Sequence, residues 1–431
     1  MTLDNNSDNN LNFNSFKERR KRLIESLKTK NPDLQNGLVI LFGDFENDRY
    51  LFRQNSNFYS LTGISEPGAV LFLYFDGSEC LYLPSYKSKR ENWVSSNVDL
   101  SAIREVKSLG KPFPGYSFNP IFTADEYENV LADLKLFLKK FDVGVFALLN
   151  FLNPKNFFSI YSFRFLVSKL PRLKDVTYDL SPILENMRSI KDRGEIVLMQ
   201  KAINTTIVAQ NAATRIISPG VLESDVLAVI ESVFISRGSV RPAFPSIIAT
   251  GKNATILHYM DRNQKLKDGD LVVVDIGAEV ENYAADITRT YPVNGKFSKR
   301  QTEIYSIVLD VQKYVALLAK PGMFLNNPSN QEKSLHHLAL NLFKEYGYDN
   351  YFIHGIGHYL GLDVHDDGSY ERPLCVGNVF TIEPGLYIPE ENLGIRIEDD
   401  YVVVEDGVVC LSDSLPKQIE EIEALINKNK N

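Results

Sequence analysis

The C-terminal half of the chain carries histidines and acidic residues in surroundings where they could do chemistry. Two of the six histidines, His336 and His337, fall in a predicted amphipathic helix, which explains them as packing or surface residues. The other four have polar or glycine-rich neighbours, and four acidic residues stand at the ends of strand-like patterns. These eight candidates are His258, Asp275, Asp286, His354, His358, His365, Glu383 and Glu398.

The first acidic pair lies in a predicted β-hairpin. Two strand patterns flank a polar stretch, and a turn centred between Val280 and Glu281 would place Asp275 directly opposite Asp286. Directly opposed residues have Cβ atoms ~5 Å apart. Two buried carboxylates at this distance repel each other unless a cation or a proton neutralises them. The hairpin therefore indicates a metal site, although one aspartate could instead be a turn or capping residue.

The second acidic pair has the same symmetry. Glu383 and Glu398 are equally distant from the turn-like pair Glu390 and Glu391, so a second hairpin would again place two acids side by side. Both registers are assumptions, because a slip of one residue turns one partner to the opposite face. Four carboxylates with one or two histidines form a hard, oxygen-rich site, which suits Mn²⁺ or similar divalent ions and has room for two.

The histidines between the two hairpins begin at His354. The four-residue spacing from His354 to His358 resembles a helical zinc motif, but Gly355 stands where that motif has its catalytic glutamate. Three glycines in this segment disfavour a helix, so we expect an extended segment along a cavity. Two metal ions ~3.5–4 Å apart can activate a water and polarise a carbonyl, while spare histidines stabilise a tetrahedral intermediate or move a proton. The residues by themselves predict a dinuclear metallohydrolase.

Length and composition limit what else the protein can be. The chain has 431 residues, 44% of them hydrophobic, and its 55 acidic and 47 basic residues give a net charge of −8. The length predicts two or three domains, and the acidic balance argues against a nucleic-acid partner. No apolar run reaches the ~18 residues of a membrane helix, no targeting peptide is recognisable, and three dispersed cysteines argue against disulfides. We therefore expect a cytoplasmic protein without a membrane partner.

Alternating helix and strand patterns predict an α/β N-terminal domain after an Asn-rich, disordered tail at residues 1–14. We place its boundary near residue 182, which gives domains at 15–182 and 183–431. The elements expected in the first domain are a helix at 17–27, strands at 38–42, 69–75, 79–83 and 143–148, and a helix capped by Thr123 and Glu126. Those expected in the second are helices at 194–217 and 223–237, strands at 271–276 and 283–293, and a helix capped by Ser298 and Gln301.

The candidate ligands resemble, in their order, the five-ligand signature of the pita-bread metallopeptidases, which include methionine aminopeptidase, prolidase and aminopeptidase P. The five residues are Asp275, Asp286, His358, Glu383 and Glu398. The motifs around them match as well, among them His-Gly-x-Gly-His, Thr-Ile-Glu-Pro-Gly and Gly-x-Arg-Ile-Glu-Asp. Residues 52–68, 245–259 and 286–297 resemble aminopeptidase P in particular. The resemblance covers most of the chain and implies an α+β fold, with a C-terminal pita-bread catalytic domain after a smaller α/β domain.

The resemblance also implies the metal ligands. Asp275 would bind one ion, while Asp286 and Glu398 would bridge two. His358 and Glu383 would each complete the shell of one ion, and Glu383 would also act as the general base on the bridging water. The cofactors would be two divalent ions, with Mn²⁺ expected first, because Co²⁺ and Zn²⁺ tolerate the same ligands.

Further residues are assigned to the substrate by the same resemblance. His258, His354 and His365 would contact the substrate and the developing tetrahedral centre, Arg396 would support the site by its charge, and Tyr387 would lie nearby. A shallow wall that includes His258, His354 and the neighbouring Tyr259 could accept a proline ring.

The implied activity is removal of an N-terminal residue that precedes proline, so the expected partners are peptides with proline second. Prolidase shares every ligand but cleaves only dipeptides, and the N-terminal motifs favour the aminopeptidase. Methionine aminopeptidase is disfavoured by the additional N-terminal domain. A non-catalytic binding module would have lost ligands, whereas all five positions are filled here. We also expect a homo-oligomer, a dimer or tetramer. The stretch around Trp93 can reach a neighbouring subunit's site in oligomeric relatives, but its sequence departs from theirs and core packing explains Trp93 equally well.

Overall fold

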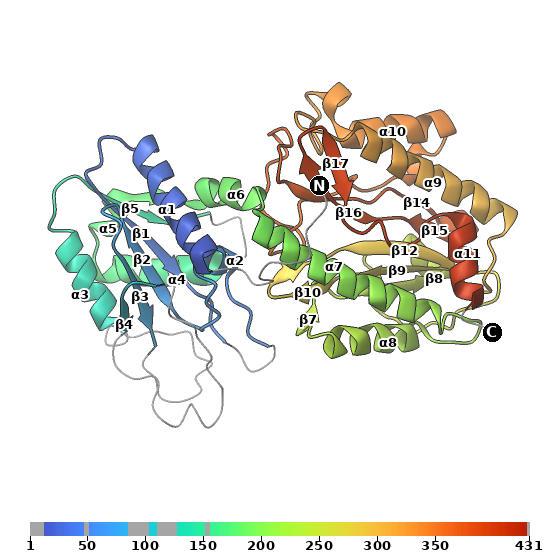
Figure 1. Cartoon of the computed structure of the whole chain (residues 1–431), viewed down its shortest axis with the longest axis horizontal. Coiled ribbons are helices and arrows are strands. Elements are labelled where there is room, and N and C mark those ends of the chain that lie inside the picture. Colours follow the sequence, from blue (N-terminus) through green and yellow to red (C-terminus); the bar gives the residue numbers. More distant parts are fainter. Residues whose placement is uncertain (1–12, 47–50, 85–102, 110–126, 151–155, 429–431) are drawn as a thin grey trace. The chain divides into compact units, whose positions relative to one another are not determined.

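The computed structural model describes residues 13–46, 51–84, 103–109, 127–150 and 156–428 (Figure 1). The chain divides into two compact units between Met187 and Arg188. Three expectations fall outside the described residues: the polar tail, apart from its last two residues, which begin the first helix; Trp93; and the cap formed by Thr123 and Glu126.

The N-terminal unit is built on a six-stranded mixed sheet with the strand order β4-β3-β2-β1-β5-β6. Its strands are β1 (Asn36–Phe42), β2 (Val70–Tyr74), β3 (Glu79–Leu83), β4 (Val106–Ser108), β5 (Val143–Ala147) and β6 (Thr177–Asp179). Its helices are α1 (Phe13–Lys30), α2 (Ser56–Thr62), α3 (Glu128–Phe137), α4 (Phe157–Lys169) and α5 (Leu173–Val176), together with most of α6 (Ser181–Ser189), whose last two residues belong to the C-terminal unit. The expected α/β domain is confirmed.

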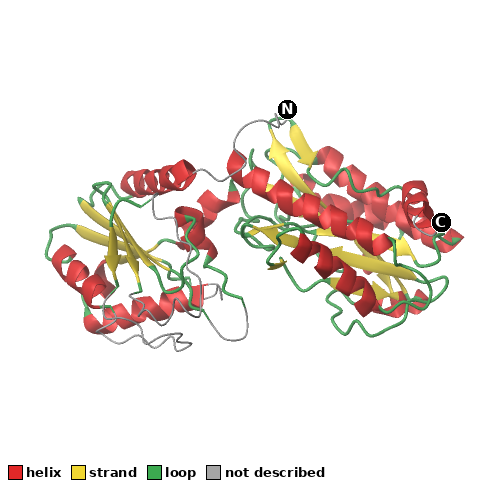
Figure 2. Ribbon diagram, turned by 60° about the horizontal axis from the view of Figure 1, so that its bottom comes forward, coloured by secondary structure: helices red, strands yellow, loops and turns green. Residues whose placement is uncertain are grey.

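Helices cover both faces of this sheet (Figure 2). Because side chains alternate along a strand, Leu38 and Ile40 of β1 pack with α3 and α4, whereas Val39 and Leu41 pack with α1 and α2. A strand buried on both faces is apolar throughout, which is why β1 appears in the sequence as an unbroken hydrophobic run.

The C-terminal unit places antiparallel strands between two layers of helices, with α7 and α8 on one side and α9 and α10 on the other (Figure 1). The helices are α7 (Arg193–Thr214), α8 (Glu223–Ser236), α9 (Lys299–Leu318), α10 (Leu335–Tyr346) and α11 (Ile419–Lys428). The strands are β7 (Arg241–Pro242), β8 (Ile247–Thr250), β9 (Leu271–Ile276), β10 (Ala278–Val280), β11 (Tyr283–Ala284), β12 (Ile287–Pro292), β13 (Val379–Ile382), β14 (Gly385–Ile388), β15 (Leu393–Arg396), β16 (Asp399–Val404) and β17 (Gly407–Cys410).

The expected helix starts are present in this unit. Ser298 and Gln301 form the predicted capping box of α9. His336 and His337 lie in α10, as expected, where the His336 ring packs 5.4 Å from the ring of Phe352. None of the helices in the described ranges is long and apolar enough to cross a membrane.

The register of the first hairpin differs from the expected one. Asp275 pairs with Thr288 and not with Asp286, so the prediction that the two aspartates oppose each other directly is wrong. The turn is formed by Glu281 and Asn282, with φ angles of 49° and 66°. Glutamate is rarely found at positive φ, so the sequence pattern did not place the turn there. The shift amounts to two residues along β12, and an even shift keeps both carboxylates on one face.

The second hairpin has the predicted register. Ile382 pairs with Asp399, and Gly385 pairs with Arg396. Glu383 and Glu398 occupy the positions between these two pairs, one at the end of β13 and one before β16. The expected turn residues Glu390 and Glu391 end a short 3₁₀ helix, η6 (Pro389–Glu391).

The histidine-bearing segment runs along β13 as far as Leu360, as expected of an extended segment, whereas residues 361–365 form bends. The N–H of Thr381 donates to the carbonyl of His358 at 2.9 Å, and the N–H of Glu383 donates to the carbonyl of Ile356 at 2.8 Å. Gly357 is required by this close approach, because a Cβ at that position would lie 1.9 Å from the Thr381 carbonyl oxygen. Backbone pairing with β13 therefore brings His358 to the acids of the second hairpin.

Candidate metal centre

A cavity of about 590 Å³ in the C-terminal unit is lined by all nine residues that the sequence assigned to the site. The two hairpins supply the acids, the segment beside β13 supplies His354 and His358, and the bends that follow it supply His365. The nine residues are His258, Asp275, Asp286, His354, His358, His365, Glu383, Arg396 and Glu398. Tyr387 also lines the cavity, whereas Tyr259 does not: its hydroxyl donates to the buried carboxylate of Glu223 at 2.9 Å, so the expectation that it helps to form the wall is wrong.

The centre of the cavity is a group of potential metal ligands. Asp286, His358 and Glu398 each offer one ligand atom, and these atoms all lie within 4.8 Å of one another. His358 Nε2 is 3.3 Å from Asp286 Oδ2 and 3.6 Å from Glu383 Oε1. Carboxylate oxygens and an imidazole nitrogen at this spacing form a donor set for divalent cations.

The acids that line the cavity are only partly neutralised: Arg396 pairs with Asp275, and several carboxylate oxygens are left over. Three of their oxygens, Asp275 Oδ1, Asp286 Oδ1 and Glu398 Oε1, are buried without a hydrogen-bond donor in the described part of the chain. Burial, together with repulsion from the other acids, raises the pKa values of Asp286 and Glu398 well above their usual range and that of Glu383 to about 8. Divalent cations would bind these orphaned oxygens and remove the repulsion, so the residues fit a metal centre.

The two histidines beside the acids are held in their neutral form. Burial, aided by the charge of Arg396, lowers the pKa of His354 to about 3, and burial next to His365 lowers that of His358 to about 4. The Nδ1 of His358 lies 3.1 Å from the carbonyl oxygen of Tyr359. Since a carbonyl only accepts, Nδ1 carries the proton, and the Nε2 lone pair faces the acids as a metal ligand requires.

A chain of hydrogen bonds connects Arg396 to His354. Arg396 Nη2 lies 2.6 Å from Asp275 Oδ2, and its Nη1 donates to the hydroxyl of Tyr387 at 2.8 Å. The Tyr387 hydroxyl lies 2.9 Å from His354 Nε2, and His354 Nδ1 lies 2.8 Å from the Gly355 carbonyl, so the proton is on Nδ1 and Tyr387 donates to Nε2. The guanidinium thus links one metal-ligand candidate, Asp275, to the cavity-lining ring of His354 through Tyr387.

Thr288 is a site residue that the sequence patterns did not indicate. Its hydroxyl donates to Glu398 Oε2 at 2.7 Å and accepts from Arg396 Nε at 3.2 Å. It links the two hairpins because it sits opposite Asp275 and two residues after Asp286 on the same face. The alternation Asp-x-Thr along β12 is the signal that would have revealed it.

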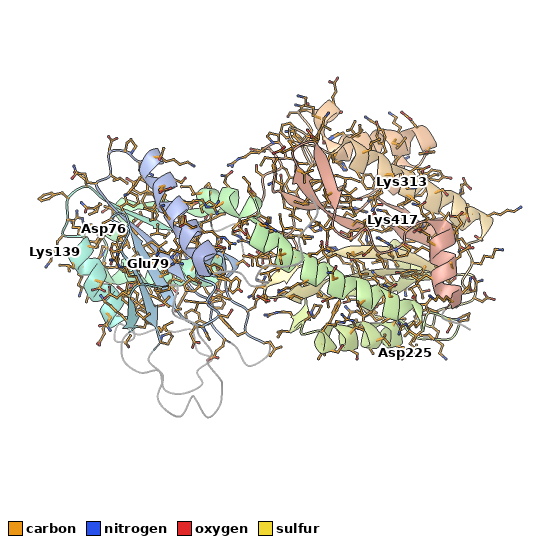
Figure 3. All side chains as sticks on the ribbon, in the orientation of Figure 1. Asp76, Glu79, Lys139, Asp225, Lys313 and Lys417 are labelled. Atoms are coloured by element: carbon orange, nitrogen blue, oxygen red, sulfur yellow. The ribbon has the colours of Figure 1, made fainter. Side chains whose placement is uncertain are left out.

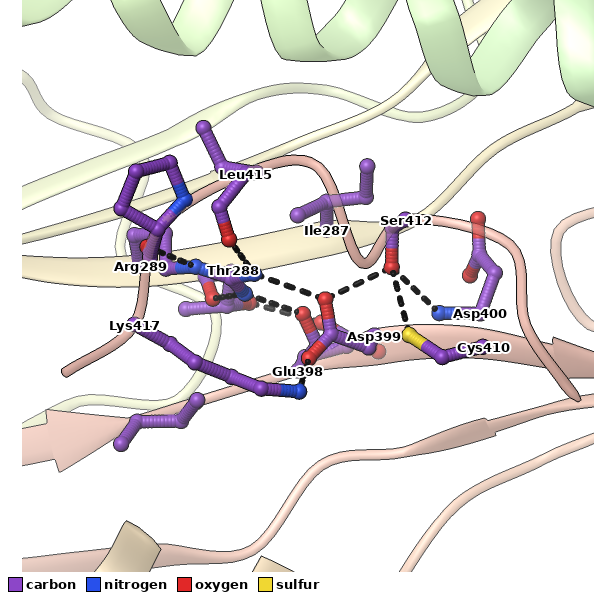
Figure 4. Close-up of polar contacts among 12 residues, drawn as sticks. Ile287, Thr288, Arg289, Glu398, Asp399, Asp400, Cys410, Ser412, Leu415 and Lys417 are labelled. Carbon is purple, nitrogen blue, oxygen red and sulfur yellow. Dashed lines mark hydrogen bonds and ion pairs between the residues drawn. The ribbon is translucent and has the colours of Figure 1, made fainter.

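A buried ion pair contacts the backbone of the ligand candidate Glu398 (Figure 4). Arg289 and Asp399 are fully buried, with Arg289 Nη2 at 2.7 Å from Asp399 Oδ1, and Arg289 Nη1 donates to the carbonyl of Glu398 at 2.7 Å. Asp399 also accepts from Ser412 Oγ at 2.6 Å and from Lys417 Nζ at 2.7 Å. Lys417 belongs to the segment between β17 and α11 (Figure 3). Asp399, although next to a ligand candidate, is therefore committed to cations outside the cavity.

Comparisons with known proteins identify the family of this chain. Residues 197–405 match the model of metallopeptidase family M24, and residues 16–124 match the aminopeptidase P N-terminal domain. Over 96% of its length, the chain is 33% identical to the Xaa-Pro aminopeptidase of Haemophilus influenzae, 97% of which is covered. The chain belongs to the aminopeptidase P group of metallopeptidase family M24.

This aminopeptidase P homologue is also similar to a solved aminopeptidase P structure and to a dipeptidase. The structure of zinc-substituted Escherichia coli aminopeptidase P in complex with product has a TM-score of 0.82 and 28% identity, with 98% of this chain and all of that chain covered. The Xaa-Pro dipeptidase of Pyrococcus furiosus is 37% identical over 87% of this chain and 96% of its own length. Membership of this family makes the protein a metal-dependent peptidase with a pita-bread catalytic domain, and it implies a dinuclear divalent metal site.

Proposed function

We propose that this enzyme hydrolyses the bond between an N-terminal residue and a following proline, in peptides of three or more residues. The observation that carries the proposal is the buried cluster of carboxylates with orphaned oxygens, in a chain that has both domains of an aminopeptidase P. We assign one ion to Asp275, both ions to Asp286 and Glu398, and one ion each to His358 and Glu383. The oxygen-rich donor set favours Mn²⁺, while Co²⁺ and Zn²⁺ remain compatible.

The bound ions would lower the pKa of a shared water and polarise the scissile carbonyl. The protein would move the proton: Glu383, whose Oε1 lies 3.6 Å from His358 Nε2 at the edge of the ligand cluster, is the general base. His354 Nδ1 lies 3.8 Å from Glu383 Oε2, so the His354 ring would contact the substrate close to the general base. His365 stands next to His358, with ring centroids 4.2 Å apart, and would donate to the developing oxyanion.

The preference for longer peptides follows from the charges around the cavity. Arg396 is the one lysine or arginine among the described residues that line it, and its three donor groups are bound to Asp275, Tyr387 and Thr288. The terminal carboxylate of a dipeptide would enter an acidic cavity with no spare cation in the described ranges. A longer peptide carries that charge farther away, while its free α-amine is attracted by the acids.

Prolidase activity is the second candidate, favoured by the 37% identity to the dipeptidase of Pyrococcus furiosus. The test compares turnover of Ala-Pro, Ala-Pro-Ala and Ala-Ala-Ala at matched concentration with added Mn²⁺. We expect Ala-Pro-Ala to be cleaved best. Faster cleavage of the dipeptide would establish a prolidase, and equal cleavage of Ala-Ala-Ala would show an aminopeptidase without proline specificity. Replacing Mn²⁺ by Co²⁺ or Zn²⁺ in the same assay tests the metal.

We further propose a cytoplasmic location and a homo-oligomeric state, which rest on the sequence. Size-exclusion chromatography with light scattering would measure the oligomeric state, and a Trp93→Ala variant of the enzyme would show whether that residue affects assembly or turnover.

A further inference from the structure

Two buried cations, Arg188 and Lys191, hold the loop at residues 363–367 of the catalytic unit, which is called the anchored loop below. Neither cation lines the cavity. Arg188 Nη1 lies 2.7 Å from Asp367 Oδ2, and its Nη2 lies 3.0 Å from Asp363 Oδ2. Lys191 Nζ lies 2.9 Å from Asp366 Oδ2, and Arg188 contacts the other oxygen of the same carboxylate. The side chains of Lys191 and Asp366 are each 1% exposed, and that of Arg188 is 5% exposed. Two cations thus pair with three acids of the loop, and the side chains of all five are largely buried.

The anchored loop is in direct contact with the catalytic histidine candidates. Asp366 follows His365 in the chain, and its N–H donates to the carbonyl oxygen of Tyr359 at 2.9 Å. The same carbonyl lies 3.1 Å from Nδ1 of His358, and the rings of His358 and His365 are 4.2 Å apart. The position of Asp366 therefore determines both the place of the His365 ring and the acceptor that orients His358.

The ion pair between Lys191 and Asp366 packs so closely against Gly361 that no residue larger than glycine fits at that position. A Cβ on Gly361 would lie 2.0 Å from Asp366 Oδ2 and 2.7 Å from Lys191 Cε. Lys191 and Arg188 outweigh the cost of burial and keep the pKa of Asp366 below its usual range, so the carboxylate stays charged. Buried ion pairs of this kind add little to stability compared with apolar residues of the same size, and a role in fixing one arrangement is their better-attested use.

We propose that Arg188 and Lys191 are positioning residues for catalysis, which act through Asp366 on His365 and His358. Neither cation lines the cavity, so neither meets the substrate. This inference rests on the proposed function, because it assumes that His365 contributes to turnover.

The test is a double-mutant cycle with Lys191→Met and His365→Ala, measured on Ala-Pro-Ala with saturating Mn²⁺. Lys191→Met alone should lower kcat roughly 10- to 100-fold, as is typical for the partners of site residues, with little change in KM. In the His365→Ala background the same substitution should lower kcat by less than about threefold, because residues that act through one another are not additive.

Three measurements make the result decisive. Lys201→Met, which removes a partly exposed lysine 3.6 Å from Glu281, should leave kcat unchanged and serves as the matched control. Metal content and the melting temperature of each variant show whether the fold is retained. If Lys191→Met does not fold, Asp363→Asn removes one acid of the same anchor and enters the cycle in its place.

Two outcomes would overturn the inference. An unchanged kcat in Lys191→Met excludes a positioning role, and an equal loss in both backgrounds shows that the cations only support the fold. An unmodified enzyme that fails to cleave Ala-Pro-Ala would instead count against the proposed function, which separates the two failures.

Discussion

Removing the metal ions should make the catalytic unit less stable as the pH rises above neutrality. In the metal-free protein the pKa of Glu383 is raised to about 8 by burial and by Asp275, whereas an unfolded glutamate has a value near 4.5. Between these two values the folded state binds more protons than the unfolded state, so the free energy of unfolding falls as the pH rises. The pKa values of Asp286 and Glu398 are raised in the same direction and add to the effect.

The buried histidines act in the opposite direction, chiefly at lower pH. Their pKa values are lowered to about 3 for His354 and about 4 for His358, so their contribution to stability increases with pH until the unfolded histidines, whose ordinary pKa is 6.5, have lost their protons. From pH 6.5 to 8 each of these histidines still adds ~0.4 kcal/mol, because its unfolded form is half protonated at pH 6.5, whereas the acids lower the stability. For Glu383 this span of ~1.5 units, at ~1.36 kcal/mol per unit, corresponds to a loss of ~2 kcal/mol.

Scanning calorimetry of the chelated enzyme at pH 6.5 and 8 would measure this loss. The transition of the catalytic unit is identified as the one that Mn²⁺ shifts, and ~2 kcal/mol should lower its midpoint by ~4–8 °C in a unit of this size. Saturating Mn²⁺ should abolish most of the difference, because the bound ions keep the acids ionised. Glu383→Gln should reduce the slope, while Glu391→Gln, at a surface ion pair with Arg300, should leave it unchanged. A midpoint that stays constant or rises from pH 6.5 to 8 without metal would refute this reasoning.

Four substitutions test the site directly. Asp286→Asn and Glu398→Gln should each abolish turnover and lower the metal content measured by atomic emission, because a neutral amide does not bridge two cations as a carboxylate does; two bound ions with normal turnover would rule out bridging. His365→Ala should keep both ions and lower kcat by on the order of 10²–10³, the value of one oxyanion donor, and loss of metal would make it a ligand instead. Gly357→Ala should displace His358 from β13, since its Cβ would lie 1.9 Å from the Thr381 carbonyl; full metal affinity in that variant would contradict the required close approach.

The sequence was a good guide wherever a local pattern carried the information. Apolar patterns predicted elements of both units, and the capping box of Ser298 and Gln301 predicted the start of α9. The symmetric spacing of Glu383 and Glu398 around their turn predicted the correct register. The predicted register of the first hairpin was wrong by two residues. Its turn places Glu281 at positive φ, which is uncommon for glutamate, so the residue types did not indicate a turn there. The prediction that Asp275 and Asp286 share one face of the hairpin still held, because an error of two residues in register does not move a side chain to the other face.

What the sequence by itself determined is therefore the identity of the chemical groups: the acids, the histidines and the strands and glycines that carry them. Only the tertiary structure decided which partner each group has. It joins Thr288 to Glu398, pairs Asp399 with Arg289 and Lys417, and pairs Asp366 with cations more than 170 positions earlier in the chain. The physical reason is that a buried charge must be matched by whatever group packing brings within about 3 Å, and packing between distant segments leaves no periodic signal in the sequence.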